Sequence, residues 1–293
     1  MFGTTRGRPR ELNAIGGLGL VLMWFWTRGA CACSLVMVFG QTSTPFFKWL
    51  KFGRKILLSL LIDDLQAKVT PPSPEEVEFY RNAIGNKYPL MGDVWGALDG
   101  LKTTIEEAGT VSVQNAFYNG WTHGHYVNSL FLFAPDAKIR YTVYNAPGTF
   151  HDSTMAQFGL YEGMKEIFSQ TGGKVVVDSA FAMPDSEFLI KSGQLDPMEA
   201  LPLLEQQQAT RVCQLSEWGM RMIQAYFPQI KDKIRFEEAG YRKVIFLLMV
   251  LLYNFQTDFI GINEILNSFM EKKTGYYAYE FDIAPSANDY LNI

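Results

Sequence analysis

The stretch YVNSLFLFAPDAKIRYTVY (126–144) contains two runs of β-forming residues joined by a short polar segment. Residues 126–133 and 139–144 are rich in aromatic and β-branched side chains, which favour strands. The connection at 134–138 contains Pro135 followed by Asp136, and both residue types suit a tight turn. The stretch therefore predicts an antiparallel β-hairpin, and this hairpin points to a fold built on a sheet.

Further strands and helices are predicted on both sides of the hairpin. Short aliphatic runs at 94–99 (VWGALD) and 174–178 (KVVVD) indicate strands, the first ending in a turn-like Asp99-Gly100 pair. Helical patterns are expected at 153–169, 203–227, 244–255 and 263–270. Strand, hairpin, helix, strand and helix in this order predict an α/β domain with a mixed sheet flanked by helices.

The first 62 residues are basic and predicted to be helical. They contain eight Lys or Arg against one acid, Glu11, whereas the other 231 residues contain 18 bases and 29 acids. Helices are expected at 15–26, at 31–39 and from Ser43 onward. This pattern favours a helix-turn-helix-like DNA-binding unit, and a helical bundle that only packs on the main domain is the alternative. The expected DNA contacts are Arg6, Arg8, Arg10, Lys48, Lys51, Arg54 and Lys55.

A proline-rich segment divides the chain. TPPSP (70–74) cannot continue a helix, and Ser73 with Glu76 forms a capping box that starts a new one. We therefore expect a basic helical unit at 1–67, a linker at 68–74, a catalytic domain at 75–271 and a loosely ordered tail at 272–293. The apolar runs 18–26 and 244–255 are shorter than the about 20 residues of a spanning helix, so buried helices and no membrane partner are expected.

Three acids stand where carboxylates from distant segments could meet. Asp99 and Asp178 end predicted strands, and Glu217 lies off the apolar stripe of a predicted helix. Taken singly, each has an ordinary structural explanation: a turn, a cap, and an ion pair with Arg221. Taken together, carboxylates that converge at a sheet edge repel one another and are typical ligands of hard divalent cations. Two such ions are the usual device for displacement at a phosphodiester.

Four segments resemble the catalytic domain of the PIF/Harbinger group of DDE transposases. They are GALDGLK (96–102), NAPGTFHDST (145–154), VVVDSAF (175–181) and RVCQLSEWGM (211–220). The resemblance covers about residues 90–265, and 38 residues separate Asp178 from Glu217. It implies an RNase H-like catalytic core preceded by a DNA-binding unit.

The resemblance also implies roles for individual residues. Asp99, Asp178 and Glu217 correspond to the catalytic metal ligands, which would hold Mg²⁺ or Mn²⁺, as two ions. His151 and Asp152 correspond to a motif that shapes the site or touches DNA, and Asp152 could replace one member of the triad. The chain departs from many relatives after Asp178, where Ser179-Ala180 stands in place of Gly-Tyr.

The function implied by the resemblance is that of a nuclear transposase. It would cut double-stranded DNA at transposon ends and join the 3′-hydroxyls to target DNA, with a Myb-like accessory protein and a homo-oligomer as further partners. The alternative is a domesticated, catalytically inactive DNA-binding protein that keeps the fold. An RNase H-like nuclease acting on RNA fits the acids but not the motifs. Lys102 and the segment 119–125 have two interpretations: phosphate contacts, or a solvated lysine and an ordinary hairpin.

Overall fold

A computed structural model describes residues 12–27, 32–107, 109–181, 186–193, 202–231, 233–234, 239–260 and 263–270. The expected contacts Arg6, Arg8 and Arg10 and the expected tail at 272–293 lie outside these residues. At the centre is a sheet whose strands are β1 (Val94–Thr104), β3 (Gly124–Phe133), β4 (Ile139–Pro147), β5 (Lys174–Asp178) and β6 (Leu189–Ser192). A short β2 (Tyr118–Asn119) pairs with the beginning of β3.

The order and directions of the strands confirm the expected mixed α/β sheet. Hydrogen bonding gives the order β4–β3–β1–β5–β6. The pairs β4–β3 and β3–β1 are antiparallel, whereas β1–β5 and β5–β6 are parallel. In the parallel register Leu98 lies beside Val177, and in the antiparallel register Asp99 lies beside Phe131. β1 is thus the central strand, with an antiparallel neighbour on one side and a parallel one on the other.

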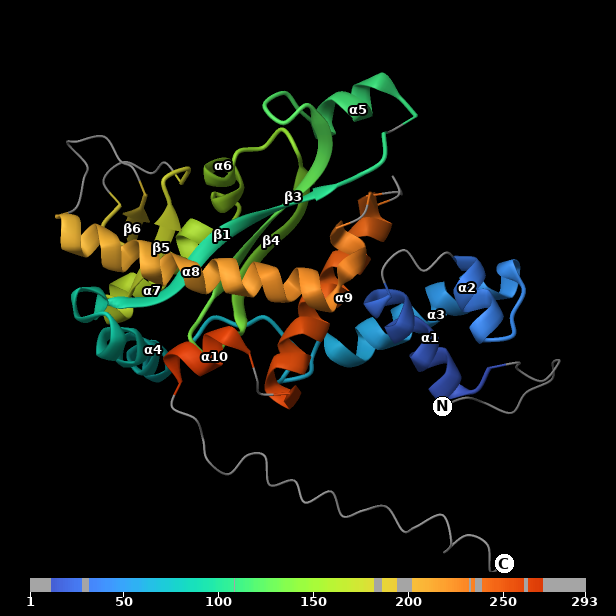
Figure 1. Cartoon of the computed structure of the whole chain (residues 1–293), viewed down its shortest axis with the longest axis horizontal. Helices are drawn as coiled ribbons and strands as arrows, with labels where there is room; N and C mark the ends of the chain where they lie inside the picture. The colour runs from blue at the N-terminus through green and yellow to red at the C-terminus, as the bar shows by residue number, and fades with distance from the viewer. Residues whose placement is uncertain are drawn as a thin grey trace, which may run out of the picture.

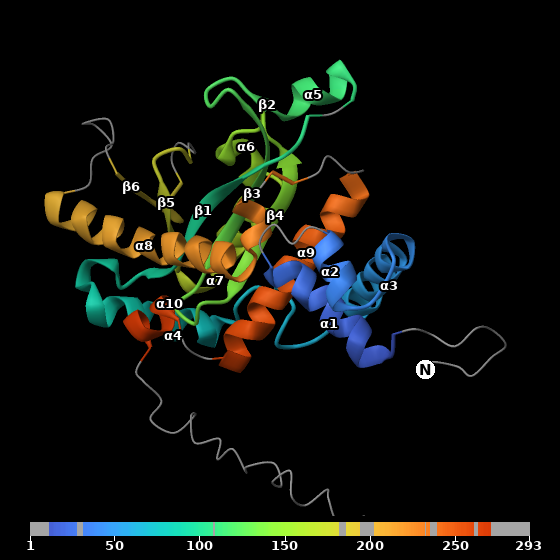
Figure 2. The ribbon, with the colours of Figure 1, turned by 45° about the vertical axis from the view of Figure 1, so that its right-hand side comes forward.

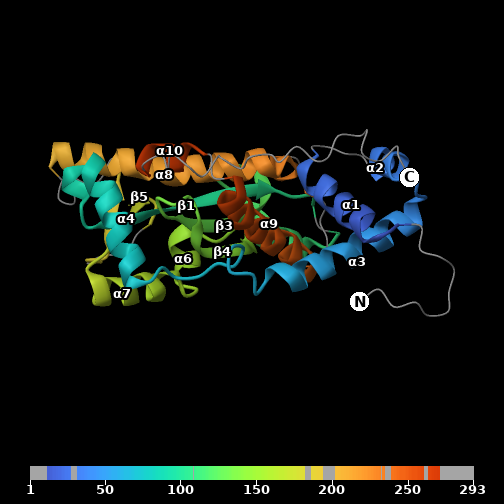
Figure 3. The same cartoon turned by 90° about the horizontal axis from the view of Figure 1, so that it is seen from below.

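Helices cover both faces of the sheet (Figures 1 and 3). α8 (Leu203–Tyr226) packs against β1, β3 and β5 on one face, and α9 (Ala239–Ile260) and α10 (Glu264–Phe269) extend that layer. α6 (Asp152–Ala156) and α7 (Leu160–Thr171) cover the other face. α4 (Pro74–Lys87), followed by the single turn η1 (Pro89–Met91), contributes to both cores, and its start has the expected capping box between Ser73 and Glu76.

Three amino-terminal helices pack at one end of the molecule (Figure 2). They are α1 (Ala14–Trp26), α2 (Ala32–Val38) and α3 (Ser43–Leu61). α3 packs on α9, and α1 packs on the single turn η2 (Pro228–Lys231), where the rings of Phe25 and Phe227 are 5.9 Å apart. Their apolar side chains belong to the same core as α8 and α9. That they act as a separate DNA-binding unit stays a prediction.

α9 is the longest apolar segment of the described chain. By length and composition Gly240–Ile260 could cross a membrane, but 56% of its most apolar window is buried inside the protein. It packs on β4 and α3, and the Asn254 amide accepts from the N–H of Ile139 (2.9 Å) and donates to its C=O (3.1 Å). In this structure α9 is a core helix that completes the hydrogen bonding of β4, in agreement with the interpretation of the run 244–255 as a buried helix.

Three expectations for the elements need correction. β1 does not end at Asp99-Gly100 but continues to Thr104, because β3 supplies a hydrogen-bonding partner along that whole length. The helix expected at 153–169 is two helices, α6 and α7, which are separated at Gly159, a residue with φ of 93°. β6 and the short helix α5 (Val111–Phe117) were not expected at all.

Candidate active site

Asp99 lies in the middle of β1 and faces α8. Side chains alternate along a strand, and Ala97 and Leu101 belong to the core under α8, whereas Leu98 belongs to the core under α7. Asp99 therefore points to the α8 side, where it is partly buried. Its carboxylate accepts a hydrogen bond from the N–H of Gly100 at 2.7 Å. A partly buried carboxylate held by its own backbone is well fixed in direction.

Asp178 lies next to Asp99 on the neighbouring strand. Val176 belongs to the α8-side core, so Asp178, two residues later, faces the same side. Leu98 and Val177 are paired, and adjacent strands are about 4.8 Å apart. The Asp178 carboxylate is exposed and accepts from the N–H of Ser179 (2.6 Å) and its hydroxyl (3.3 Å). The two aspartates thus border one another at the end of β5.

Glu217 is presented by the helix that packs over these strands. α8 approaches β3 so closely that a Cβ on Gly219 would lie 2.5 Å from the ring of Phe133. Ser216 is buried, whereas Glu217 is exposed. Cys213, one turn earlier, is buried, and this burial raises the pKa of its thiol, with the charges of Asp99 and Asp178 adding to the rise. Glu217, one turn later, is itself among the acids whose charge contributes to the raised pKa of Asp99.

Asp152 approaches from the opposite face of the sheet. It is the first residue of α6, and its carboxylate oxygens lie 2.9 and 3.0 Å from where a Cβ on Gly100 would be. Only glycine fits at that position of β1 without displacing the acid. Burial raises the pKa of Asp152 and the charge of Asp178 adds to the rise, while Lys102 and His151 oppose it. Asp152 is thus a fourth carboxylate close to the other three, and its charge contributes to the raised pKa of Asp99.

The electrostatics of Asp99 show that these acids act on one another. Burial raises the pKa of Asp99 to about 6 against an ordinary value of 3.8, and Asp178, Asp152 and Glu217 each contribute to the rise. The N–H of Gly100 lowers the pKa but does not cancel the increase. Within the described part of the chain, none of the four acids has an ion pair with Lys, Arg or His. The site therefore concentrates negative charge: Lys102 and His151 oppose the rise in the pKa of Asp152, but no cation of the described chain does so for Asp99.

The acids are neighbours that do not form a closed ligand cage. Among the residues that the structure describes, no three His, Cys, Asp or Glu side chains converge closely enough to hold one metal ion. The donor set itself is all carboxylate oxygen, which is what Mg²⁺ and Mn²⁺ prefer. Because Asp178 and Glu217 are exposed, their side chains have room to turn toward an ion. The residues present therefore fit a hard divalent cation.

The expected DNA contacts on α3 divide into two kinds. Lys48, Lys51 and Lys55 are exposed, as a DNA-binding surface requires. Arg54 is only 2% exposed; its guanidinium lies 3.5 Å from the ring centroid of Trp24 and donates to the hydroxyl of Tyr241. The prediction that Arg54 contacts DNA is therefore wrong for this structure, because its side chain is a buried link between α1, α3 and α9.

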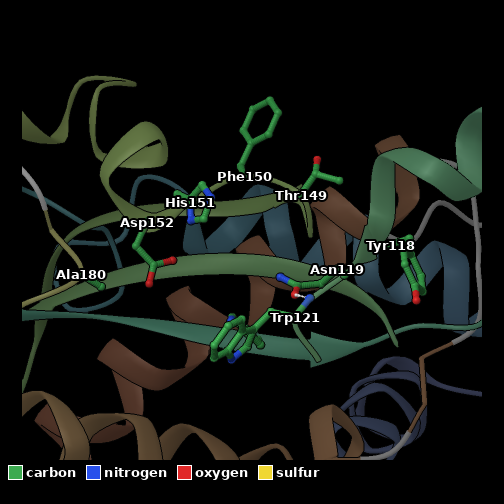
Figure 4. A pocket seen from close by; sticks show the side chains of 10 residues that line it. Tyr118, Asn119, Trp121, Thr149, Phe150, His151, Asp152 and Ala180 are labelled. Atoms are coloured by element: carbon green, nitrogen blue, oxygen red, sulfur yellow. Dashed lines mark hydrogen bonds between the residues drawn. The ribbon is translucent and has the colours of Figure 1, made fainter. Parts of the chain in front are cut away.

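A pocket of about 390 Å³ lies beside Asp152. Residues 118–121 form one wall, residues 149–152 form another, and Lys102 and Ala180 complete the lining (Figure 4). Lys102 and 119–125 stand out in the sequence as polar, but no motif there indicates that the two walls meet. One signal is readable: Trp121 stands among polar and glycine residues, outside any apolar pattern, and it is 91% exposed.

Comparison with known proteins gives one family match. A family model described as DDE superfamily endonuclease matches residues 98–254, more than half of the chain and a range that includes all four acids. No curated protein matches the chain.

Two similar solved structures are a Mos1 transposase paired-end complex with left transposon end and a pre-cleavage Mos1 transpososome. The first has 8% identity and a TM-score of 0.24, covering 87% of this chain and 77% of that one. The second has 10% identity and a TM-score of 0.23, covering 87% and 81%. Similarity this low carries no argument about the present chain.

Proposed function

The chain belongs to the DDE superfamily endonucleases, and on this basis we propose that it is a metal-dependent transposase of the PIF/Harbinger type. In this proposal it cleaves phosphodiester bonds at transposon ends and joins the 3′-hydroxyls to target DNA. Asp99, Asp178 and Glu217 are its metal ligands. The observation that carries the proposal is the placement of these acids: Asp99 on β1 and Asp178 at the end of the neighbouring β5 face the same side of the sheet, and α8, which packs on that side, contains Glu217.

Two divalent cations, Mg²⁺ or Mn²⁺, are the expected cofactors. When bound, such ions activate the attacking hydroxyl and stabilise the leaving oxygen in displacement at phosphorus. The protein's own contribution is position and charge. Asp99 is fixed by β1 and by the N–H of Gly100, while Asp178 and Glu217 stand exposed beside it from β5 and α8. Removing any one acid would relieve repulsion in the metal-free protein and weaken cation binding.

The finer features of the proposal rest on sequence motifs and surface charge. The segments around His151-Asp152 and after Asp178 resemble the PIF/Harbinger group, and the exposed lysines of α3 suit double-stranded DNA. We extend the proposal to action in the nucleus, to assembly as a homo-oligomer on paired ends, and to a Myb-like accessory protein. Location, assembly and accessory protein can each be tested independently of whether the acids bind metal and cleave DNA.

The second candidate function is an inactive DNA-binding protein that retains the fold. It is favoured by one observation: no three acids of the described chain converge as a ready metal cage. The two candidates differ in what divalent ions do. An enzyme should gain thermal stability from Mg²⁺ and cut DNA, whereas an inactive copy should bind DNA equally well with or without the ion.

The test pairs thermal melts with a nicking assay. Wild-type protein, Asp178→Asn and Glu217→Gln would be melted in EDTA and in Mg²⁺ and assayed on DNA that contains the terminal repeats. We expect both variants to fold, to lose the Mg²⁺-dependent rise in Tm and to lose nicking. Glu162→Gln is the matched control, since Glu162 is an exposed helical acid on α7, away from the site. Wild-type protein that neither gains stability from Mg²⁺ nor nicks DNA would favour the inactive binder.

A further inference from the structure

The loop that contains Trp121 is tied to the segment that contains Asp152. The Asn119 side chain donates to the C=O of Gly148 (3.0 Å), and the Thr149 hydroxyl donates to the C=O of Ala116 (3.0 Å). A Cβ on Gly148 would lie 2.5 Å from the C=O oxygen of Tyr126 and 2.7 Å from that of Phe117, so the two segments meet backbone to backbone. The loop therefore has a fixed position relative to the candidate active site.

Within the loop, Trp121 is held outward. The Asn119 carboxamide oxygen accepts from the N–H groups of Trp121 (3.1 Å) and Thr122 (3.2 Å), which closes the turn. Trp121 is nevertheless 91% exposed, the largest exposed fraction of any large apolar side chain in the described chain. A tryptophan held in water by a well-anchored turn gains nothing for folding, since its apolar area stays solvated. Its position suits a ligand that stacks on it.

The pocket under Trp121 also contains a lysine and a histidine. Lys102 and His151 both line it, and both oppose the rise in the pKa of Asp152 that burial causes. Lys102 is exposed and, within the described residues, has no ion pair. In Figure 4, His151 lies above the Asp152 carboxylate and the Trp121 ring lies below it, so the two rings come from opposite walls of the pocket. An aromatic ring at one wall, the His151 imidazole at the other and an exposed lysine in the lining match a nucleotide, with its flat base and its phosphate.

The pocket shares β1 with the carboxylates. Asp99 faces α8, whereas Lys102, three residues later, lies on the other side of the same strand, toward α6. Gly100 lies between them, directly under the Asp152 carboxylate. A DNA strand whose phosphate reaches the carboxylates would therefore have a neighbouring nucleotide within reach of the pocket. A base inside a duplex is stacked on its neighbours, so only an unpaired or extruded base can enter.

We propose that this pocket binds one unpaired nucleotide of the DNA strand next to the phosphodiester that is cut. Trp121 stacks on the base, and Lys102 and His151 contact its phosphate. This inference rests on the proposed function, because it takes DNA as the substrate of the adjoining acids. Stacking on an aromatic ring tolerates every base, so the pocket recognises the unpaired state of the nucleotide and not its identity.

The test measures binding without requiring cleavage. The probe is a short DNA duplex with a single unpaired 2-aminopurine, compared with the same duplex fully paired, and Ca²⁺ replaces Mg²⁺. We expect wild-type protein to prefer the unpaired probe and to quench its fluorescence. Trp121→Ala should bind that probe about tenfold more weakly, because the base no longer has a ring to stack on, and should bind the paired duplex almost as well as wild type. Trp121→Phe should retain most of the preference, which separates stacking from misfolding.

Two further variants complete the design. Lys102→Gln should flatten the salt dependence of binding to the unpaired probe by about 0.7 in the log–log slope, because one phosphate of a single strand is then no longer neutralised. Phe259→Ala is the control, because Phe259 is also an exposed aromatic (78%) but lies on α9. We expect it to leave both affinities unchanged.

The outcomes separate this proposal from the catalytic one. Equal affinity of Trp121→Ala and wild-type protein for the unpaired probe would overturn the proposal that the pocket binds an unpaired nucleotide, even if the wild type cuts DNA normally. Loss of self-association in Trp121→Ala with DNA binding intact would overturn it too, since Trp121 would then contact a second copy. If the wild type prefers the unpaired probe and Trp121→Ala loses that preference, but no DNA is cut with Mg²⁺, then the nucleotide pocket is supported and the endonuclease proposal fails.

Discussion

A partly buried carboxylate that has three other acids near it, and no ion pair within the described chain, raises the free energy of the folded state once it ionises. Asp99 is in this position: its pKa of about 6 in the folded protein lies above its ordinary 3.8. A raised folded pKa means that protonation stabilises the fold. That stabilisation is complete below about pH 4 and is lost as the pH rises through about 6. The site thus costs stability at neutral pH, which is common where acids are gathered for binding cations.

Asp99→Asn should therefore change the pH dependence of stability. In EDTA at about pH 8 we expect the variant to be more stable than wild type by roughly 1–3 kcal/mol, because one unit of pKa corresponds to about 1.4 kcal/mol. At about pH 4 the difference should shrink, since Asp99 is then largely protonated. Urea unfolding at the two pH values measures it. Asp63→Asn, at an exposed site after α3, is the control. A difference that is the same at both pH values would contradict the electrostatic account of Asp99.

Arg54 shows what the sequence could reveal at the scale of one residue. Its neighbours Lys51 and Lys55 made it look like part of a basic surface. The helical period places it on the line of Phe46, Leu50 and Leu57, which is the buried side of α3. A charged residue on that line is buried only where it has partners, here Trp24 and Tyr241. The period was readable from the sequence, but the partners, from α1 and α9, were not.

At the scale of elements, the sequence predicts those strands whose residue composition favours β structure. It misses those that form only because a neighbouring strand supplies hydrogen bonds. The hairpin β3–β4 and strand β5 follow from their β-branched and aromatic residues. β6 has only four residues and exists because Ile190 and its neighbours pair with β5. Asp99-Gly100 looked like a turn, yet β3 provides hydrogen bonds past it. Tertiary pairing overrode local propensity in both cases.

Part of the candidate site could likewise be predicted from the sequence, and part could not. The three acids could be proposed from motifs that each lie within one element. The pocket beside Asp152 could not, because residues 118–121 and 149–152 meet only through contacts such as that of Asn119 with Gly148. No period or motif in the sequence encodes a contact between two loops that are so far apart along the chain.

The docking of α8 on the sheet fixes where Glu217 stands, and Gly219 permits that docking. A methyl group at Gly219 would lie 2.5 Å from the ring of Phe133, so Gly219→Ala must shift the helix or the ring. We expect a decrease of roughly 1–3 kcal/mol in the free energy of unfolding, as for overpacked cores, and weaker Mg²⁺-dependent stabilisation. Gly240→Ala is the control, because nothing lies within 4 Å of its added methyl. Equal effects of the two substitutions would contradict the close approach of α8.

At the scale of the whole molecule, positive and negative surfaces lie apart. α3, with its exposed lysines, is at one end of the molecule, and β5 and β6 are at the other (Figure 1). A DNA duplex that reaches the acids and the lysines of the same chain would run along the length of the protein. The lysines would then supply affinity that is independent of sequence, and the acids with their cations would act on one phosphodiester.

This division predicts the salt dependence of DNA binding. Reversing Lys48, Lys51 and Lys55 to Glu should flatten the log–log slope of affinity against salt by about 0.9 for each phosphate that is no longer neutralised. Lys165→Glu, an exposed charge reversal on α7, should change it little. Filter binding or fluorescence anisotropy over a range of NaCl concentrations gives both slopes. A slope that is unchanged in the triple variant would show that DNA is held by another surface.

In the proposed function, acids from β1, β5 and α8 jointly hold the cations that catalyse DNA cleavage. Crystals soaked in Mn²⁺ and measured for anomalous scattering test this most directly, because the map locates each ion and its ligands. We expect anomalous peaks coordinated by Asp99, Asp178 and Glu217, with one or two ions between the sheet and α8. Mn²⁺ bound by a different set of residues, or no ion at these acids at saturating concentration, would contradict the proposed metal site.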